Sequence, residues 1–225
     1  MPNSSASIYN YWVKWPRLRV SLLCCVLLSG CMPQEIPDLV PLPTPSTAAA
    51  SPAAGPLQAA LLTAADLPAG FVHFDYFEQP TSGETGCAGD FDPPKPDAVT
   101  QFRRGEAGPF VHTTLTRLSV ADATALMLAA RRFTDQCPSY TLRDMNGTLL
   151  TTRVTAGSIT GLGDETVATR FTTTADGYPP FLSDQVLVRR GGLLILLAHN
   201  AFYQLDTAVT TIAVRAAVAR AERFS

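Results

Sequence analysis

His73 and Asp75 form the first pair of residues in the sequence whose types and spacing could do chemistry. They lie two positions apart in the segment FVHFDYF, whose alternation predicts a strand with Val72, Phe74 and Tyr76 on its opposite face. An imidazole beside a carboxylate can act as an oriented base or contribute to a metal site. Because no third ligand or nucleophile stands at a suitable spacing, we favour a half-exposed polar strand face.

Three acidic residues, Asp90, Asp92 and Asp97, occupy a Gly/Pro-rich stretch that we predict to be a long loop from Gln79 to Asp97. Carboxylates are the ligands that hard cations prefer, but the EF-hand spacing is absent and the intervening prolines hinder a wrapping loop. We therefore interpret the three residues as solvated loop acids. The loop itself is the first candidate for a binding surface.

Two arginine pairs, Arg103-Arg104 and Arg189-Arg190, could clamp an anion by bidentate hydrogen bonds. Each pair precedes a glycine, so the exposed end of a hairpin explains them equally well. The tripeptide Gly163-Asp164-Glu165 resembles a catalytic tripeptide, but a turn in which the aspartate bonds its own backbone explains it as well. His112 and His199, in or at the end of expected strands, are interpreted as surface or satisfied core residues.

Motifs for catalysis are missing from the sequence: it contains no G-x-S-x-G, H-E-x-x-H, paired C-x-x-C, S-x-x-K or phosphate-binding glycine loop. Most enzymes need an activated nucleophile, an acid–base pair or a metal. We therefore predict a protein that is not an enzyme, with no catalytic residue, no metal ligand and no cofactor.

The last cysteine near the start of the chain, Cys31, follows Leu28, Ser29 and Gly30 at the end of an apolar run. A basic stretch with Lys14 precedes that run, and this order is the layout of a secretory signal. The apolar core is too short to span a membrane, which takes about 20 residues. Leu28 to Cys31 resembles the lipobox of bacterial lipoproteins, in which the cysteine thiol is linked to diacylglycerol before cleavage. The alternative is an ordinary cysteine in a plain signal.

This interpretation divides the chain into residues 1–30 as a lipoprotein signal peptide, 31–56 as the lipidated cysteine and a linker, and 57–225 as one extracytoplasmic domain. The linker has seven prolines between Met32 and Pro56, and proline-rich chain is extended and semi-rigid. Its Pro/Ala/Thr composition is typical of actinobacterial tethers. The anchored protein would face the outside of the cell membrane.

The net charge of the chain after residue 30 argues against nucleic acid and anionic lipid as partners. Removing residues 1–30 lowers the 17 Lys and Arg residues to 14 against 19 Asp and Glu, a net charge of −5. An acidic surface argues against nucleic acid and against charge-driven adhesion to anionic lipid. The membrane contact must then come from the lipid on Cys31.

Two cysteines remain in the domain, Cys87 and Cys137. In an oxidising compartment an isolated pair is more often bridged than free, and a bridge would stabilise the domain by about 4 kcal/mol in the chain-entropy model. Two buried thiols are the alternative.

The expected elements give an α+β fold in which helices pack on an antiparallel sheet. Helices are predicted at Leu57–Ala64, at Val120–Asp135 behind a Ser119 cap, and at Leu205–Glu222. The apolar stripes of the last two are expected to be Leu126, Ala130, Phe133 and Cys137, and Leu205, Val209, Ile212, Ala216 and Ala219. Strands are predicted at 99–103, 110–118, 140–145, 148–159 and 166–173, and on either side of Arg190-Gly191-Gly192. Asn146-Gly147 marks a hairpin turn.

The succession LLTAADLPAGF, a loop cysteine, RRFTDQCPSY, GLGDETVATR and VLVRRGGLLILLA resembles a group of actinobacterial lipoproteins. These are similar to the extracellular sensor domains of mycobacterial membrane serine/threonine kinases. The resemblance implies an α+β domain with a cleft for a ligand, and it transfers no binding residue. This chain departs from those kinases in having no kinase half and only two domain cysteines, where the sensor domains carry two disulfides.

We therefore expect a lipid-anchored extracytoplasmic domain that binds or senses a small molecule or an envelope component in a cleft flanked by the Gln79–Asp97 loop. An envelope protein–protein interaction module without a small-molecule pocket is the alternative. A hydrolase with a non-standard site around His73 and Asp75 is a third hypothesis.

Overall fold

The computed structural model describes residues 56–75, 82–85, 87, 94–144 and 146–223, all within one compact unit. The predicted signal peptide, Leu28 to Cys31, nearly all of the linker and much of the 79–97 loop lie outside these residues. None of the helices in the described ranges is long and apolar enough to cross a membrane.

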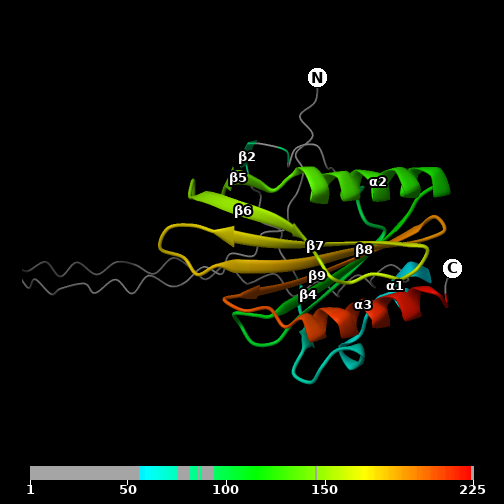
Figure 1. Cartoon of the computed structure of the whole chain (residues 1–225). Coiled ribbons are helices and arrows are strands. Elements are labelled where there is room, and N and C mark those ends of the chain that lie inside the picture. Colours follow the sequence, from blue (N-terminus) through cyan, green and yellow to red (C-terminus); the bar gives the residue numbers. More distant parts are fainter. Residues whose placement is uncertain (1–55, 76–81, 86, 88–93, 145, 224–225) are drawn as a thin grey trace, which may run out of the picture. The chain divides into compact units, whose positions relative to one another are not determined.

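A nine-stranded antiparallel sheet forms the centre of the domain, with the strand order β1-β3-β4-β9-β8-β7-β6-β5-β2 (Figure 1). The strands are β1 (Val72–His73), β2 (Ser82–Thr85), β3 (Ala98–Arg103), β4 (Phe110–Arg117), β5 (Ser139–Arg143), β6 (Leu149–Ala156), β7 (Glu165–Thr174), β8 (Phe181–Arg190) and β9 (Leu193–Phe202). β9 lies between β4 and β8 in the middle of the sheet, as its continuous apolar run from Leu193 to Ala198 predicts.

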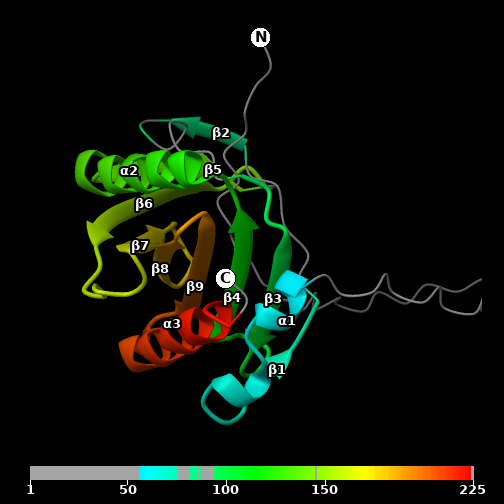
Figure 2. The same ribbon diagram turned by 90° about the vertical axis from the view of Figure 1, so that its right-hand side faces the viewer.

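Three α-helices pack on this sheet: α1 (Pro56–Ala60), α2 (Val120–Gln136) and α3 (Thr207–Ala221), with a 3-10 turn, η1, at Ala64–Asp66. α2 covers one face, which we call the α2 face, and α1 and α3 pack on the other, the α3 face (Figure 2). The arrangement confirms the predicted α+β class.

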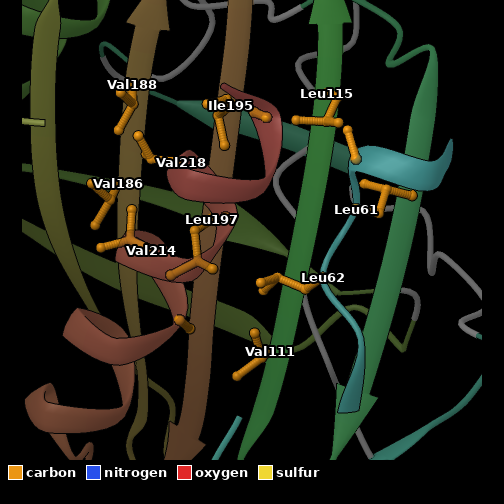
Figure 3. Packing of buried hydrophobic residues seen from close by; sticks show 14 of the residues in the cluster. Leu61, Leu62, Val111, Leu115, Val186, Val188, Ile195, Leu197, Val214 and Val218 are labelled. Atoms are coloured by element: carbon orange, nitrogen blue, oxygen red, sulfur yellow. The ribbon is translucent and has the colours of Figure 1, made fainter. Parts of the chain in front are cut away.

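The larger core lies on the α3 face. Val186, Ile195 and Leu197 from the sheet pack against Val214 and its neighbours on α3 (Figure 3). The predicted stripe of this helix is confirmed at Val209 and at Ala216, which is half-buried and packs against this core, and it is wrong at the exposed Ile212 and Ala219. Ile212 is 47% exposed, and the buried positions are Val209, Thr210, Ala213, Val214, Ala217, Val218 and Ala221. Alanine and valine occur all around the helix, so apolar periodicity alone did not fix which side faces the sheet.

α2 begins where its cap predicts. The backbone N–H of Asp122 donates to Oγ of Ser119 over 3.1 Å, as in a capped helix start. Ala123, Met127 and Ala130 are the buried positions of the helix, and Cys137 is buried at its C-cap. Leu126 and Phe133 are half-buried and pack against the core. The predicted stripe is therefore confirmed, and the structure adds Ala123 and Met127 to it.

The hairpin predicted at Asn146-Gly147 joins β5 to β6, and Gly147 has the positive φ of +79° that favours glycine. Two expectations near the start of the domain are wrong. The predicted strand around FVHFDYF is reduced to Val72 and His73, and Val72 is 55% exposed because β1 is a short edge strand. The predicted 79–97 loop contains β2, which pairs with β5.

Candidate ligand-binding face

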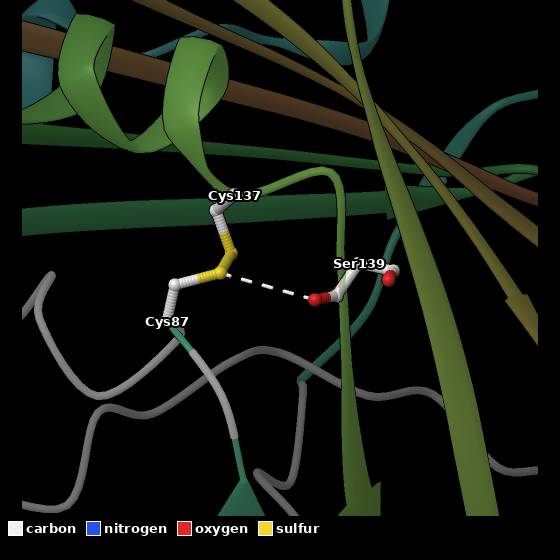
Figure 4. The surroundings of a disulfide bond; sticks show 3 residues. All are labelled: Cys87, Cys137 and Ser139. Carbon is white, nitrogen blue, oxygen red and sulfur yellow. Dashed lines mark hydrogen bonds between the residues drawn. A yellow bond between two sulfur atoms is a disulfide. The ribbon is translucent and has the colours of Figure 1, made fainter.

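The two domain cysteines form a disulfide, Cys87–Cys137, with the Cα atoms 5.6 Å apart (Figure 4). Cys137 is the C-cap of α2, and its N–H donates to the carbonyl of Phe133. The bridge therefore fastens the chain after β2 to the end of α2, as predicted. Sγ of Cys87 lies 3.8 Å from the carbonyl oxygen of Ser139. This is a van der Waals contact, because a disulfide sulfur has no hydrogen to donate.

His73 and Asp75 gain no catalytic setting. Both are exposed, and the His73 ring packs edge-on against Phe102 with centroids 5.8 Å apart. Within the described ranges, no group of three His, Cys, Asp or Glu side chains is placed to hold a metal ion. Asp97, the one predicted loop acid among these residues, accepts a hydrogen bond from the backbone N–H of Arg117 over 2.7 Å.

The arginine pairs have protein partners. Arg189 donates to Glu165 and Asp164, and Arg190 lies 3.5 Å from Glu222. Asp164 also accepts the backbone N–H of Gly191 over 2.7 Å. Its carboxylate therefore bonds the connection between β8 and β9, and not its own backbone as the predicted turn required. Arg103 and Arg104 stack over aromatic rings, those of Phe74 and Phe71 respectively. Arg189 and Arg190 therefore form ion pairs within the domain, in place of the anion clamp that was one of their two interpretations.

Four polar side chains gather instead on the α2 face of the central strands. Gln101 on β3 lies directly opposite His112 on β4, and Ser183 on β8 lies opposite Asn200 on β9. Asn200 also pairs across β4 with Phe110, two residues before His112, so Asn200 and His112 are diagonal neighbours. We call Gln101, His112, Ser183 and Asn200 the polar patch.

The polar patch is buried and incompletely hydrogen-bonded. Asn200 is 1% exposed, Ser183 6% and Gln101 7%. Both amide atoms of Asn200, Oγ of Ser183 and Oε1 of Gln101 have no hydrogen-bond partner in the part of the chain that the structure describes. Burying such groups unpaired costs roughly 1–3 kcal/mol each, so their presence here calls for a partner outside the described residues.

α2 runs past the polar patch without covering it. Its first half packs on Leu194, Leu187 and Val167. Further on, Thr134 bonds Thr169 over 2.6 Å, and Phe133 packs on Phe171. The contacts thus move from β9 and β8 toward β7, whereas the polar patch lies on β3, β4 and the opposite ends of β8 and β9.

Solvent reaches the same face beside the polar patch. Val99, on the α2 face of β3, is 37% exposed, and Leu196 and Gln185 are half-buried. Leu196 and Gln185 adjoin Ala198, the residue opposite His112. The polar patch therefore lies next to a partly exposed region of the same face.

Phenylalanine rings border the polar patch at the other end. Phe110 and Phe181 are buried, and the half-buried rings of Phe74 and Phe202 pack against them, with centroids 5.9 Å and 5.2 Å away. Burial also lowers the pKa of His112 to about 4, so its imidazole is neutral at physiological pH. The polar patch thus presents neutral hydrogen-bonding groups beside aromatic rings.

A second cluster of buried polar side chains lies on the α3 face, and most of its polar atoms are hydrogen-bonded. Arg170 donates two hydrogen bonds to Asp184, of 2.6 and 2.8 Å. Thr210 on α3 donates to the same carboxylate over 3.3 Å and bonds Nδ1 of His199 over 2.9 Å. Thr210 and His199 are both fully buried, so this chain of bonds holds α3 on the sheet and offers no nucleophile to a substrate.

Most of the polar patch lies at positions that the sequence analysis does not single out. His112 is expected there as a surface or core residue, whereas Gln101, Ser183 and Asn200 have no assigned role. All three lie in strands and are buried in the structure. A polar residue at a core position of a strand is the pattern that could have indicated them.

Comparison with known proteins shows a similarity in fold and none in sequence. No protein-family model and no curated protein matches the chain. The fold is similar to the extracellular domain of PknH from Mycobacterium tuberculosis, with a TM-score of 0.53 and 10% sequence identity over 73% of this chain and 94% of that one. At this identity the match establishes the fold, and it confirms the resemblance to the sensor domains of mycobacterial kinases.

Proposed function

We propose that this chain is a lipoprotein, anchored to the outer face of the cell membrane through Cys31, whose domain is a sensor-like module that binds a ligand on the polar patch. The signal layout before Cys31 and the proline-rich linker support the anchor. The Cys87–Cys137 disulfide supports an oxidising compartment. Similarity to the extracellular domain of a kinase supports the sensor-like role.

The observation that carries the binding proposal is the amide of Asn200. It is 1% exposed and unpaired among the described residues, in the middle of a sheet where Ser183 on the adjacent strand and Gln101 two strands away also have unpaired atoms. A fold held by packing alone would place apolar residues at these positions. Polar groups that converge on a partly apolar surface are typical of small-molecule sites.

Native mass spectrometry of the full chain tests this proposal. The protein is expressed in an actinobacterial host, extracted from membranes in mild detergent and kept unreduced. We expect the wild type to carry a bound small molecule and Asn200→Leu, which keeps the side-chain shape but removes the amide, to lose it. Thr113→Val is the matched control, because Thr113 is a buried unpaired hydroxyl on the α3 face, and it should retain the molecule.

Two results would contradict the proposal. One is a wild-type mass with no bound molecule. The other is a bound molecule that Asn200→Leu and Thr113→Val retain equally, since the ligand would then lie away from the polar patch. The first result would favour the alternative of a protein–protein interaction module.

A further inference from the structure

We infer that the ligand of the polar patch is a neutral polyhydroxylated molecule, with a short oligosaccharide as its type, an inference that rests on the proposed binding function. Four features carry it: the mixture of donors and acceptors in the polar patch, the lack of formal charge on its four residues, the bordering aromatic rings, and the distance that the polar patch spans across the strands.

The unpaired atoms include both donors and acceptors. Asn200 offers an N–H₂ group and a carbonyl oxygen, Gln101 offers a carbonyl oxygen, and the Ser183 hydroxyl can do either. A sugar hydroxyl also donates and accepts, so two adjacent hydroxyls can satisfy both atoms of one amide. A hydrocarbon ligand would leave all of these groups unpaired, at a cost that argues against it.

The four residues of the polar patch carry no formal charge. On β1 and β3–β9, the charged side chains of the α2 face are Arg103, Glu165 and Arg189. Glu165 and Arg189 bond each other over 2.8 Å near α2. Arg103 lies at the border of the patch, two residues from Gln101 on the same strand, and its guanidinium stacks over the ring of Phe74. Phosphate or carboxylate ligands are held by Arg and Lys, and cations by carboxylates. The four residues of the patch supply neither.

The aromatic border supplies the other half of sugar recognition. The ring faces of pyranoses carry C–H groups that pack on aromatic side chains, while their hydroxyls point outward to polar partners. Phe74 and Phe202 are half-buried at the border, so parts of both rings are open to contact. Amides beside phenylalanine rings therefore match a molecule with apolar faces and a hydroxylated rim.

The length of the row sets the size of the ligand. From Gln101 on β3 to Ser183 on β8 the polar patch crosses β4 and β9, and three strand spacings amount to roughly 14 Å. A single sugar ring cannot reach both ends. An oligosaccharide of two or three rings can.

Isothermal titration of the full-length protein in detergent tests the inference. The neutral probes are maltotriose, cellotriose and chitotriose, and the charged probes are inorganic phosphate and glucuronate. We expect at least one neutral trisaccharide to bind with one-to-one stoichiometry. Its dissociation constant should rise at least tenfold in Asn200→Leu and stay within twofold of wild type in Thr113→Val. Far-UV circular dichroism confirms that both variants are folded.

The outcomes separate this inference from the proposed function. Binding of phosphate or glucuronate, lost in Asn200→Leu, without binding of a neutral trisaccharide would overturn the ligand class and leave the binding function standing. No binding of any neutral trisaccharide would likewise overturn the inference, even if native mass spectrometry shows another bound molecule. A crystal structure with ordered water alone on the polar patch, together with a ligand-free mass, would overturn both.

Discussion

Nδ1 of His199 lies 2.9 Å from Oγ1 of Thr210, and this contact joins the central strand β9 to the first turn of α3. Because Thr210 donates its one hydroxyl hydrogen to Asp184, its oxygen accepts from His199, which places the imidazole proton on Nδ1. Arg170 completes the chain at the carboxylate of Asp184. Residues from β7, β8, β9 and α3 are thus tied together inside the α3 face.

Removing the hydroxyl in the middle of this chain should destabilise the domain. Thr210→Val keeps the shape of the side chain but leaves the Nδ1 donor of His199 without its partner, which we expect to lower the free energy of unfolding by about 2 kcal/mol. Urea denaturation measures this change. Thr211→Val is the control, because Thr211 on the same helix is half-buried and its hydroxyl bonds the carbonyl of Thr207 within the helix, so the change in stability should be about 0.5 kcal/mol or less. Equal effects of the two variants would show that the chain contributes nothing.

The two buried histidines make the fold sensitive to acid. Burial lowers the pKa of both His112 and His199 from 6.5 to about 4. Between these values the unfolded chain binds protons that the folded domain does not, so stability is complete above pH 6.5 and is lost as the pH falls toward 4. The slope is roughly 1.4 kcal/mol per pH unit for each histidine.

Urea denaturation at pH 7.5, 6, 5 and 4.5 checks this dependence. His199→Asn and His112→Asn should each remove about half of the slope, whereas the exposed His73→Asn should leave it unchanged. A stability that is flat between pH 7.5 and 4.5 in the wild type would contradict the neutral state of both imidazoles.

Local signals predicted much of this fold. The Ser119 cap, the Asn146-Gly147 turn and the apolar run from Leu193 to Ala198 depend on neighbouring residues, so the sequence contains the information that fixes them. β2 pairs with β5, which is more than 50 residues away in the chain, and no local pattern indicates such an edge contact. The α3 stripe was wrong in part because the alanines at 213 and 217 bury as well as larger apolar residues.

The candidate site could be predicted only in part for the same reason. The disulfide followed from a count of cysteines and an assumed compartment. The polar patch depends on the register of β3, β4, β8 and β9, which brings Gln101 and Asn200 to one face although they are about 100 residues apart. Register arises from tertiary pairing, and a polar residue in a strand gives no sign of its neighbours two strands away.

Loss of the Cys87–Cys137 bridge should weaken the domain measurably. The bridge closes a loop of about 50 residues, for which the chain-entropy model gives about 4 kcal/mol. Guanidinium unfolding of the double variant Cys87→Ser/Cys137→Ser should show a loss of 2–4 kcal/mol in the free energy of unfolding, roughly as found for other native bridges. Reductant should destabilise the wild type and leave the double variant unchanged. A wild type that is insensitive to reductant would contradict a stabilising bridge.

The lipid anchor makes a separate prediction about location. Cys31→Ser removes the thiol that a thioether requires, so the protein should leave the membrane fraction or retain its signal as an uncleaved precursor. Fractionation and immunoblotting of the actinobacterial host measure both. Cys25→Ser alters a cysteine inside the apolar run and should remain processed and membrane-bound. Normal processing with unchanged membrane retention in Cys31→Ser would contradict the lipoprotein proposal.

Replacing Asn200 with leucine should have opposite effects on the stability of the domain and on ligand binding. Leucine has nearly the same shape, and it replaces two buried unpaired polar atoms with an apolar group. Asn200→Leu should therefore raise the free energy of unfolding of the ligand-free protein by about 1–2 kcal/mol while it abolishes ligand binding. Ser183→Ala, which removes the neighbouring hydroxyl, should change stability in the same direction by a smaller amount. A loss of stability in Asn200→Leu would show that the native amide is already satisfied within the chain, and the polar patch would then be a structural feature of the sheet.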